Sequence, residues 1–244
     1  MKPYYDEAGI TIYHGDCREV LPARAALSID SIITDPPYCP RAMKNARSGS
    51  TIKQRRDGKI YDFGYSALTA ELRADVSREM ARLASRWCLT WCDLESISAW
   101  RVDLESAGLR YIRTGVWVRE HGATQFSGDR PAQGAEACVI AHGTSERLRW
   151  NGGGKPAAWV GQIVNSQAAR GHSSPKPLWL MCRQVRDFTD PGELIVDPFM
   201  GSGTTLLAAK NLGRRAIGIE IEEKYCRIAV ERLRQSILPL RAGM

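Results

Sequence analysis

The sequence predicts one α/β domain built on a doubly wound, mostly parallel sheet. Short apolar runs that end in an acidic residue are typical of buried parallel strands, and two occur, at residues 32–34 before Asp35 and 194–196 before Asp197. Residues 194–237 read as strand, glycine turn, helix, strand and helix, which is the βαβ pattern of a parallel sheet. A length of 244 residues suits one large domain, so we assign residues 1–244 to a single domain.

The elements expected along the chain alternate in the same way. They are strands at 10–14, 29–34, 87–92, 109–119, 135–141, 194–197 and 216–220, and helices at about 18–25, 67–85, 94–107, 204–212 and 223–237. A further helix follows Pro175; Ser173 or Ser174 can cap it, and its first turn tolerates Pro175 and Pro177.

The composition is that of a globular protein with a modest basic excess. Lys and Arg number 34 against 27 Asp and Glu, which permits a polyanionic partner without requiring one. The N-terminus lacks the apolar core of a signal peptide and no run reaches about 18 apolar residues, so we expect a cytoplasmic protein and no membrane partner.

Seven irregularly spaced cysteines favour reduced thiols. Cys88, Cys92, Cys138 and His142 offer zinc-ligand types, but in apolar strand-like stretches, so we predict buried thiols and no metal.

Two irregular stretches are candidates for nucleic-acid contact. Residues 39–66 carry seven Lys and Arg against two Asp. A loop of this length is usually functional or disordered, and we interpret it as a basic flap that contacts phosphates; a solvated loop is the alternative. In residues 143–170, Trp150 and Trp159 are interleaved with basic residues, which suits nucleic-acid contact or a surface excursion with its own small apolar cluster.

The stretch Asp35-Pro36-Pro37-Tyr38 predicts a site for a planar group that carries an NH₂. Each proline fixes φ and lacks an N–H, so the backbone is stiff and its carbonyls are free to accept. The Asp35 carboxylate and the Pro36 carbonyl can accept the two amino hydrogens while Tyr38 stacks on the ring. The alternative is a proline-rich turn that ends a strand, with Tyr38 simply packed.

A glycine turn and a distant acidic residue predict a nucleoside site. Phe199-x-Gly201-x-Gly203 lies at the carboxyl end of a strand, where doubly wound sheets bind ligands. Glu220 ends the following strand and can accept both ribose hydroxyls. A dinucleotide site prefers a third glycine where this chain has Leu206, so we predict S-adenosyl-L-methionine, which contains no pyrophosphate.

In ordered blocks the chain resembles the β-class amino-DNA methyltransferases, which modify adenine N6 or cytosine N4. Residues 35–38 look like the catalytic motif, 172–178 like the block before the cofactor loop, 197–205 like that loop, 218–220 like the ribose-binding strand end, and 14–17 like a block that contacts the cofactor's adenine. The resemblance implies that the catalytic residues are Asp35, Pro36, Pro37 and Tyr38. It implies cofactor contacts from Asp16, Cys17, Asp35, Lys176, Asp197, Pro198, Phe199, Gly201, Ser202, Gly203, Thr204 and Glu220. His172 receives no chemical role.

The resemblance also implies the fold and the reaction. The expected fold is a Rossmann-like, class I methyltransferase sheet of seven strands, with 109–119 and 135–141 as its antiparallel end. The order is cyclically shifted, so the last two strands lie beside the first ones. A target-recognition insert is expected at about 143–170, which is short for the family.

The expected activity is transfer of a methyl group from S-adenosyl-L-methionine to adenine N6 in double-stranded DNA, with the base flipped out. Asp at the first position of the catalytic motif favours adenine by resemblance, and cytosine N4 is the alternative. Methylation of RNA or of a protein glutamine, a non-catalytic DNA-binding module and a nicotinamide oxidoreductase are the rival interpretations. The resemblance allows a homodimer, and it allows a separate cognate nuclease or none.

Overall fold

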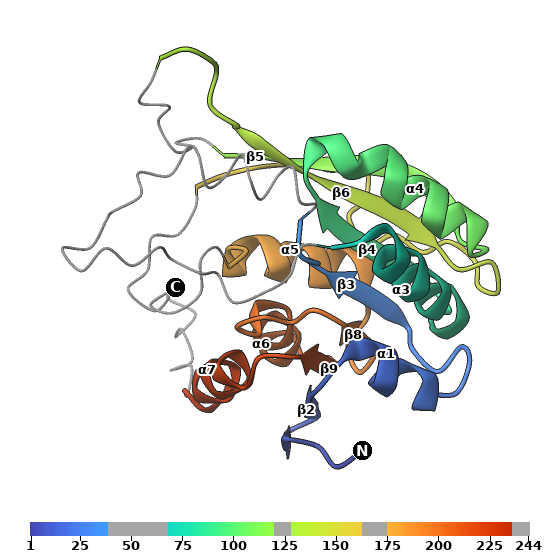
Figure 1. The fold of residues 1–244 in the computed structure, drawn as a ribbon, viewed down its shortest axis with the longest axis vertical. Helices are drawn as coiled ribbons and strands as arrows, with labels where there is room; N and C mark the ends of the chain where they lie inside the picture. Colours follow the sequence, from blue (N-terminus) through green and yellow to red (C-terminus); the bar gives the residue numbers. More distant parts are fainter. Residues whose placement is uncertain (39–67, 120–127, 163–174, 236–244) are drawn as a thin grey trace.

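The computed structural model describes residues 1–38, 68–119, 128–162 and 175–235 (Figure 1). The predicted basic flap at 39–66 lies outside the described residues. So do His172 and the two serines, Ser173 and Ser174, that we expected to cap a helix.

One sheet of nine strands runs through the described part of the chain, in the order β1-β2-β9-β8-β3-β4-β6-β5-β7. Its strands are β1 (Tyr5–Glu7), β2 (Ile10–His14), β3 (Ser31–Thr34), β4 (Trp87–Cys92), β5 (Arg110–Val118), β6 (Ala135–His142), β7 (Ala158–Val160), β8 (Leu194–Asp197) and β9 (Arg215–Glu220). The five strands from β2 to β4 in this order are parallel. Strand β6 is antiparallel to both β4 and β5.

This topology confirms the predicted fold. The seven expected strands are present, β5 and β6 form the antiparallel end, and β8 and β9 lie between β2 and β3, which is the expected cyclic shift. The edge strands β1 and β7 were not predicted. Each has three residues, too few for the alternation that marks a strand in sequence.

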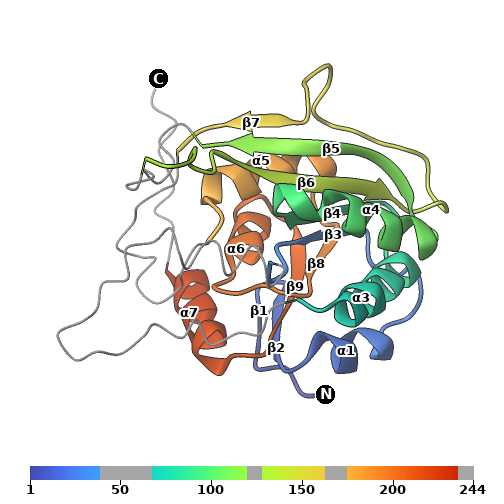
Figure 2. The ribbon, with the colours of Figure 1, turned by 45° about the horizontal axis from the view of Figure 1, so that its top comes forward.

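Helices cover both faces of the sheet, and each face has its own core (Figures 1 and 2). One core joins the sheet to α5 (Leu178–Phe188), α6 (Thr204–Asn211) and α7 (Glu223–Arg234). The other joins it to α1 (Cys17–Val20), α3 (Ala70–Leu83) and α4 (Ile97–Ser106). Short 3₁₀ turns, η1 (Leu21–Ala23) and η2 (Leu94–Ser96), complete the described helical elements. None of the described helices combines the length and apolar composition needed to cross a bilayer.

The start of α5 differs from the prediction. The helix begins at Leu178, and its N-cap is Pro177, with φ −60° and ψ 137°, instead of Ser173 or Ser174. A residue that precedes a proline is held in extended backbone, so Lys176 cannot belong to the first turn. Lys176 therefore lies immediately before the helix, close to the end of the sheet.

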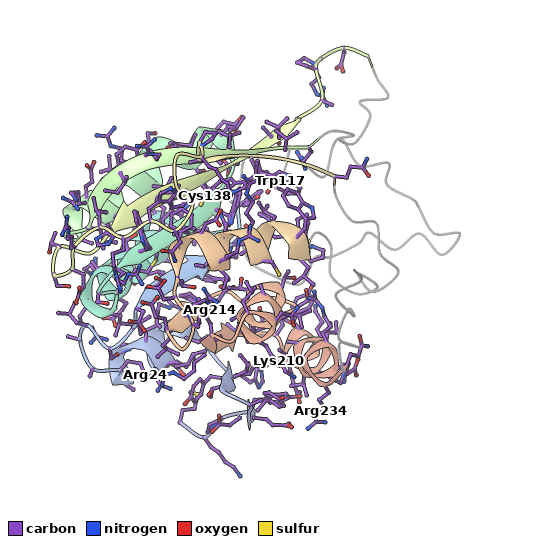
Figure 3. The ribbon with its side chains drawn as sticks, turned by 180° about the vertical axis from the view of Figure 1, so that it is seen from behind. Arg24, Trp117, Cys138, Lys210, Arg214 and Arg234 are labelled. Carbon is purple, nitrogen blue, oxygen red and sulfur yellow. The ribbon has the colours of Figure 1, made fainter. Side chains whose placement is uncertain are left out.

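The aromatic residues are mainly core residues. Trp87, Trp91 and Trp117 are buried (Figure 3 labels Trp117). Trp159 on β7 is 2% exposed in the same core, and the Trp150 ring lies 4.6 Å from that of Phe188. Trp159 therefore belongs to the main core and Trp150 packs against it, so the two rings do not form a separate small apolar cluster. Burial leaves the Trp159 ring unavailable for nucleic-acid contact.

Candidate active site

Four acidic residues follow neighbouring parallel strands at one edge of the sheet. Asp16 lies two residues after β2, Glu220 ends β9, Asp197 ends β8 and Asp35 follows β3. Because the carboxyl ends of parallel strands meet at the same edge, these four residues lie side by side in sheet order. Residues 35–38 and the glycine turn therefore lie at the same edge, which follows from the cyclically shifted strand order that the sequence predicted.

Direct hydrogen bonds join these strand ends. The Thr34 hydroxyl donates to Asp197 Oδ1 at 2.8 Å, which ties the residue before Asp35 to the start of the glycine turn. The Gly15 N–H donates to the Glu220 carbonyl at 3.0 Å. The four strand ends are thus held in register by contacts across the sheet.

The glycine turn approaches helix α7 too closely for a side chain. Gly203 has φ +76°, and a Cβ added there would lie 2.8 Å from the Ala229 Cβ. Gly203 also precedes the first residue of α6, so the free N–H groups of that helix face the edge of the sheet. The local sequence therefore positions a helix N-terminus beside Glu220.

Glu220 is placed to bind hydroxyl groups. One carboxylate oxygen accepts from the Gly201 N–H at 3.0 Å and the other from the Glu222 N–H at 2.8 Å. Each oxygen keeps a lone pair for a further donor. Burial raises the pKa of Glu220, and the backbone N–H groups oppose that rise. These properties fit the ribose hydroxyls of S-adenosyl-L-methionine.

Other predicted cofactor residues have structural partners. Asp197 is 2% exposed, its Oδ1 accepts from the Phe199 N–H at 3.1 Å, and burial raises its pKa to about 7. Ser202 and Thr204 accept from the Arg232 guanidinium at 2.9 and 3.1 Å.

The remaining predicted contacts flank the turn and the end of β2. Phe199 is partly buried against one core, and Pro198 and Cys17 are buried. Asp16 accepts from the Arg18 N–H at 2.8 Å as the N-cap of α1, and the Arg18 side chain also pairs with it. The hydrogen bonds from the Arg18 side chain, together with the one from its backbone N–H, lower the pKa of Asp16. Asp16 is thus a helix cap at the end of the strand beside β9.

Asp35 presents one paired and one unpaired oxygen. Oδ2 lies 2.6 Å from Lys176 Nζ. Oδ1 is buried and has no hydrogen-bond partner in the part of the chain that the structure describes. A buried acceptor without a partner costs about 1–3 kcal/mol, so this oxygen favours the arrival of a donor. That observation fits the predicted role of accepting an amino hydrogen.

Lys176 and Glu136 join Asp35 and Tyr38 in one buried cluster. Lys176 Nζ lies 2.9 Å from Glu136 Oε2 and 3.2 Å from the Tyr38 hydroxyl oxygen. The Tyr38 hydroxyl donates to Glu136 Oε2 at 2.6 Å, and Arg119 lies 3.2 Å from Glu136 Oε1. Lys176 is buried and not solvated.

The charges in this cluster shift one another's protonation. Burial raises the pKa of Asp35, and the Lys176 ammonium opposes that rise. The two carboxylates hold the pKa of Lys176 above its ordinary value despite burial. Burial also raises the pKa of Tyr38, so its hydroxyl stays protonated and keeps donating.

Glu136 and Arg119 were not predicted from the sequence. Glu136 is the single charged residue in the otherwise apolar stretch that forms most of β6, and that isolation was the available signal. Cys88, Cys92 and Cys138 are buried free thiols, as predicted. Within the described ranges, no group of three or more His, Cys, Asp or Glu side chains could hold a metal ion.

Comparisons with known proteins agree with this geometry. The family model described as DNA methylase, of the N6/N4 type, matches residues 29–231. The type II methyltransferase M2.DpnII of Streptococcus pneumoniae is 28% identical, covering 95% of this chain and 92% of its own. The solved complex of M1.HpyAVI with S-adenosylmethionine is 26% identical, with a TM-score of 0.67 over 92% of this chain and 99% of that one.

A further solved structure has the same fold at lower identity. The cytosine-N4-specific PvuII DNA methyltransferase is 18% identical, with a TM-score of 0.72 over 95% of this chain and 88% of that one. The matches together confirm the predicted fold, S-adenosyl-L-methionine as the methyl donor and DNA as the substrate class. The chain belongs to the N6/N4 DNA methylase family.

Proposed function

We propose that this protein methylates the exocyclic N6 of adenine in double-stranded DNA. The observation that carries the proposal is the unpaired Oδ1 of Asp35 at the sheet edge that also holds the glycine turn. This oxygen and the Pro36 carbonyl would accept the two hydrogens of the amino group. The nitrogen of such a base is a poor nucleophile because its lone pair is delocalised into the ring. Acceptors that hold both N–H bonds can draw the nitrogen toward a tetrahedral geometry and free that lone pair, so the gain is orientation and electrostatics.

The chain's own residues would hold the cofactor beside this acceptor pair. Glu220 takes the ribose hydroxyls, the 197–204 turn surrounds the nucleoside end, and Asp16 with Cys17 lies at the adjacent strand end. When bound, S-adenosyl-L-methionine supplies an electrophilic methyl group on a sulfonium.

Flipping of the target base follows from the depth of the acceptor. Asp35 Oδ1 is buried, so an amino group inside a duplex cannot reach it, and the base must leave the stack. Tyr38 would then stack on the extruded ring. We assign the contacts that select the target sequence to residues 143–170 and the phosphate contacts to 39–66.

Cytosine N4 is the second candidate substrate. It is kept because the matching family model is of the N6/N4 type and covers both bases. Both amino groups suit the same acceptor geometry, and we favour adenine because the first position of the motif is Asp35. RNA and a protein glutamine are further planar acceptors for the same site.

One experiment separates these substrates. The protein is expressed in cells that lack other DNA methylation, and the DNA is sequenced with modified-base detection. We expect N6-methyladenine within one short sequence motif, with an Asp35→Ala strain as the matched control. N4-methylcytosine in its place would refute the adenine assignment. Labelled methyl transfer to RNA or protein, with none to DNA, would refute the proposal as a whole. Measurement of the molecular mass in solution tests whether the protein is a homodimer. Co-purification with the products of neighbouring genes tests whether it has a cognate nuclease.

A further inference from the structure

A buried bridge of charged side chains connects the two ends of the catalytic stretch. Among the described residues, Lys176 Nζ has three polar contacts: Asp35 Oδ2 at 2.6 Å, Glu136 Oε2 at 2.9 Å and the Tyr38 hydroxyl at 3.2 Å. The side chains of Lys176 and Glu136 are 6% and 8% exposed. With Arg119 on the far side of Glu136, two cations balance two carboxylates, so the cluster is buried without net charge.

The geometry gives each member of the bridge a separate task. Because Lys176 holds Oδ2, the Asp35 carboxylate cannot rotate freely, and Oδ1 remains the oxygen that is available to a substrate. Glu136 accepts from the Tyr38 hydroxyl at 2.6 Å, which fixes the orientation of the aromatic ring. Acceptor and stacking surface are thus oriented by the same two side chains.

We propose that Lys176 and Glu136 are positioning residues for methyl transfer, which orient Asp35 and Tyr38 through a buried ammonium–carboxylate bridge. The inference rests on the proposed roles of Asp35 and Tyr38. Neither Lys176 nor Glu136 touches the reacting atoms; each acts through one residue of the catalytic stretch.

The donor count of Lys176 separates this role from the cofactor contact predicted from the sequence. An ammonium group has three hydrogens, and here three acceptors surround it: Asp35, Glu136 and Tyr38. No hydrogen is left over for the carboxylate of a cofactor. Binding a cofactor through Lys176 would require breaking one of these buried contacts.

The bridge also has a consequence for pH dependence. Among the described residues, Lys176 contacts Asp35, Glu136 and Tyr38, lies 5.4 Å from the Trp91 ring, and interacts electrostatically with the thiols of Cys92 and Cys138. Asp197 in turn faces Asp35. Without the ammonium, burial and the Glu136 charge would both raise the pKa of Asp35 unopposed. A smaller fraction of Asp35 would then be ionised at neutral pH, and the rate would recover as the pH rises.

The test compares Lys176→Met and Lys176→Arg with a control, Lys2→Met, which changes an exposed lysine near the N-terminus. Methyl transfer to DNA is measured from about pH 6 to about pH 9, together with the Kd for S-adenosyl-L-methionine. We expect kcat of Lys176→Met to fall by about 10²-fold at neutral pH, as for a displaced catalytic group. The Kd for S-adenosyl-L-methionine should be unchanged. The rise of the rate with pH on the acid side of the pH–rate profile should move to higher pH. Lys176→Arg keeps a cation and should recover part of the rate.

Two outcomes would overturn the role of Lys176. One is an unchanged kcat in Lys176→Met; the other is a Kd that rises as kcat falls, which would mark Lys176 as a cofactor contact. The double variant Lys176→Met with Glu136→Gln removes one charge of each sign and keeps an acceptor for Tyr38. Full recovery of kcat in it would show that charge balance alone matters, and would refute positioning.

A readout that does not need activity separates this inference from the proposed function. The ammonium resonance of Lys176 in ¹⁵N-lysine NMR should be protected from exchange and should shift in Asp35→Asn and in Glu136→Gln. If the wild-type protein transfers no methyl group to DNA, the proposed function fails, and these shifts still decide whether the bridge exists. A resonance that neither substitution moves would refute it.

Discussion

Replacing Asp35 with alanine removes the acceptor on which the proposed reaction depends. The change deletes Oδ1, which is buried and unpaired in the described residues, and Oδ2, which is 2.6 Å from Lys176 Nζ. Loss of one preorganised partner of a developing charge costs about 2.7–4 kcal/mol, or about 10²–10³ in kcat. Loss of the orientation of the amino nitrogen adds about 10². We therefore expect kcat to fall by about 10⁴ or more, the product of these two factors.

The assay is transfer of a labelled methyl group to DNA in a single turnover, with cofactor binding measured by calorimetry. Lys176 keeps Glu136 as a partner at 2.9 Å, so we expect the variant to fold and to bind S-adenosyl-L-methionine with little change in Kd. Asp75→Ala, at a partly exposed aspartate of α3 that pairs only with Arg78 among the described salt bridges, is the matched control. A rate for Asp35→Ala within about tenfold of wild type, far short of the expected loss, would falsify the acceptor role.

Three further predictions concern stacking, the glycine turn and a buried carboxyl. Tyr38→Ala should lose about 1–3 kcal/mol of base stacking, measured as a weaker kcat/KM on DNA. Gly203→Ala should destabilise the fold by about 1–3 kcal/mol in thermal or urea unfolding, because φ is +76° and the new Cβ meets Ala229 at 2.8 Å. Asp197 has its folded-state pKa raised to about 7, so the folded protein holds this proton more tightly than the unfolded chain does. Its contribution to stability is therefore greatest at acidic pH and is lost as the pH rises through about 7. Asp197→Asn keeps an acceptor oxygen without the charge, so its melting temperature relative to wild type should increase from pH 5 to pH 8.

Each of these predictions has a result that contradicts it. An unchanged kcat/KM in Tyr38→Ala would argue against base stacking on that ring. Gly192→Ala is the control for the turn, because Gly192 has φ +82° but open space around it. Equal destabilisation by the two glycine substitutions would show that the contact with α7 is unimportant. A melting-temperature difference for Asp197→Asn that is constant with pH would contradict the raised pKa.

Much of the fold was predictable because it rests on local patterns. Strands β2 and β4 begin and end where the sequence predicted, since each is an apolar run bounded by polar or turn residues. The start of α5 was misjudged because a serine cap and a proline in the first turn are both acceptable locally. The edge strand β7 was missed, since its pairing with β5 depends on a partner far along the chain.

The sequence alone predicted the stretch at 35–38, the glycine turn and the acidic strand end at Glu220 as the parts of the site. Each is a short motif whose chemistry depends on neighbouring residues, and the order of these motifs indicated the family. The structure alone decided which side chains complete the site. Tyr38 and Glu136 are 98 positions apart and Tyr38 and Lys176 are 138 apart, yet all three share hydrogen bonds. No local pattern encodes such a meeting, because it depends on how the antiparallel end of the sheet and the start of α5 pack beside β3.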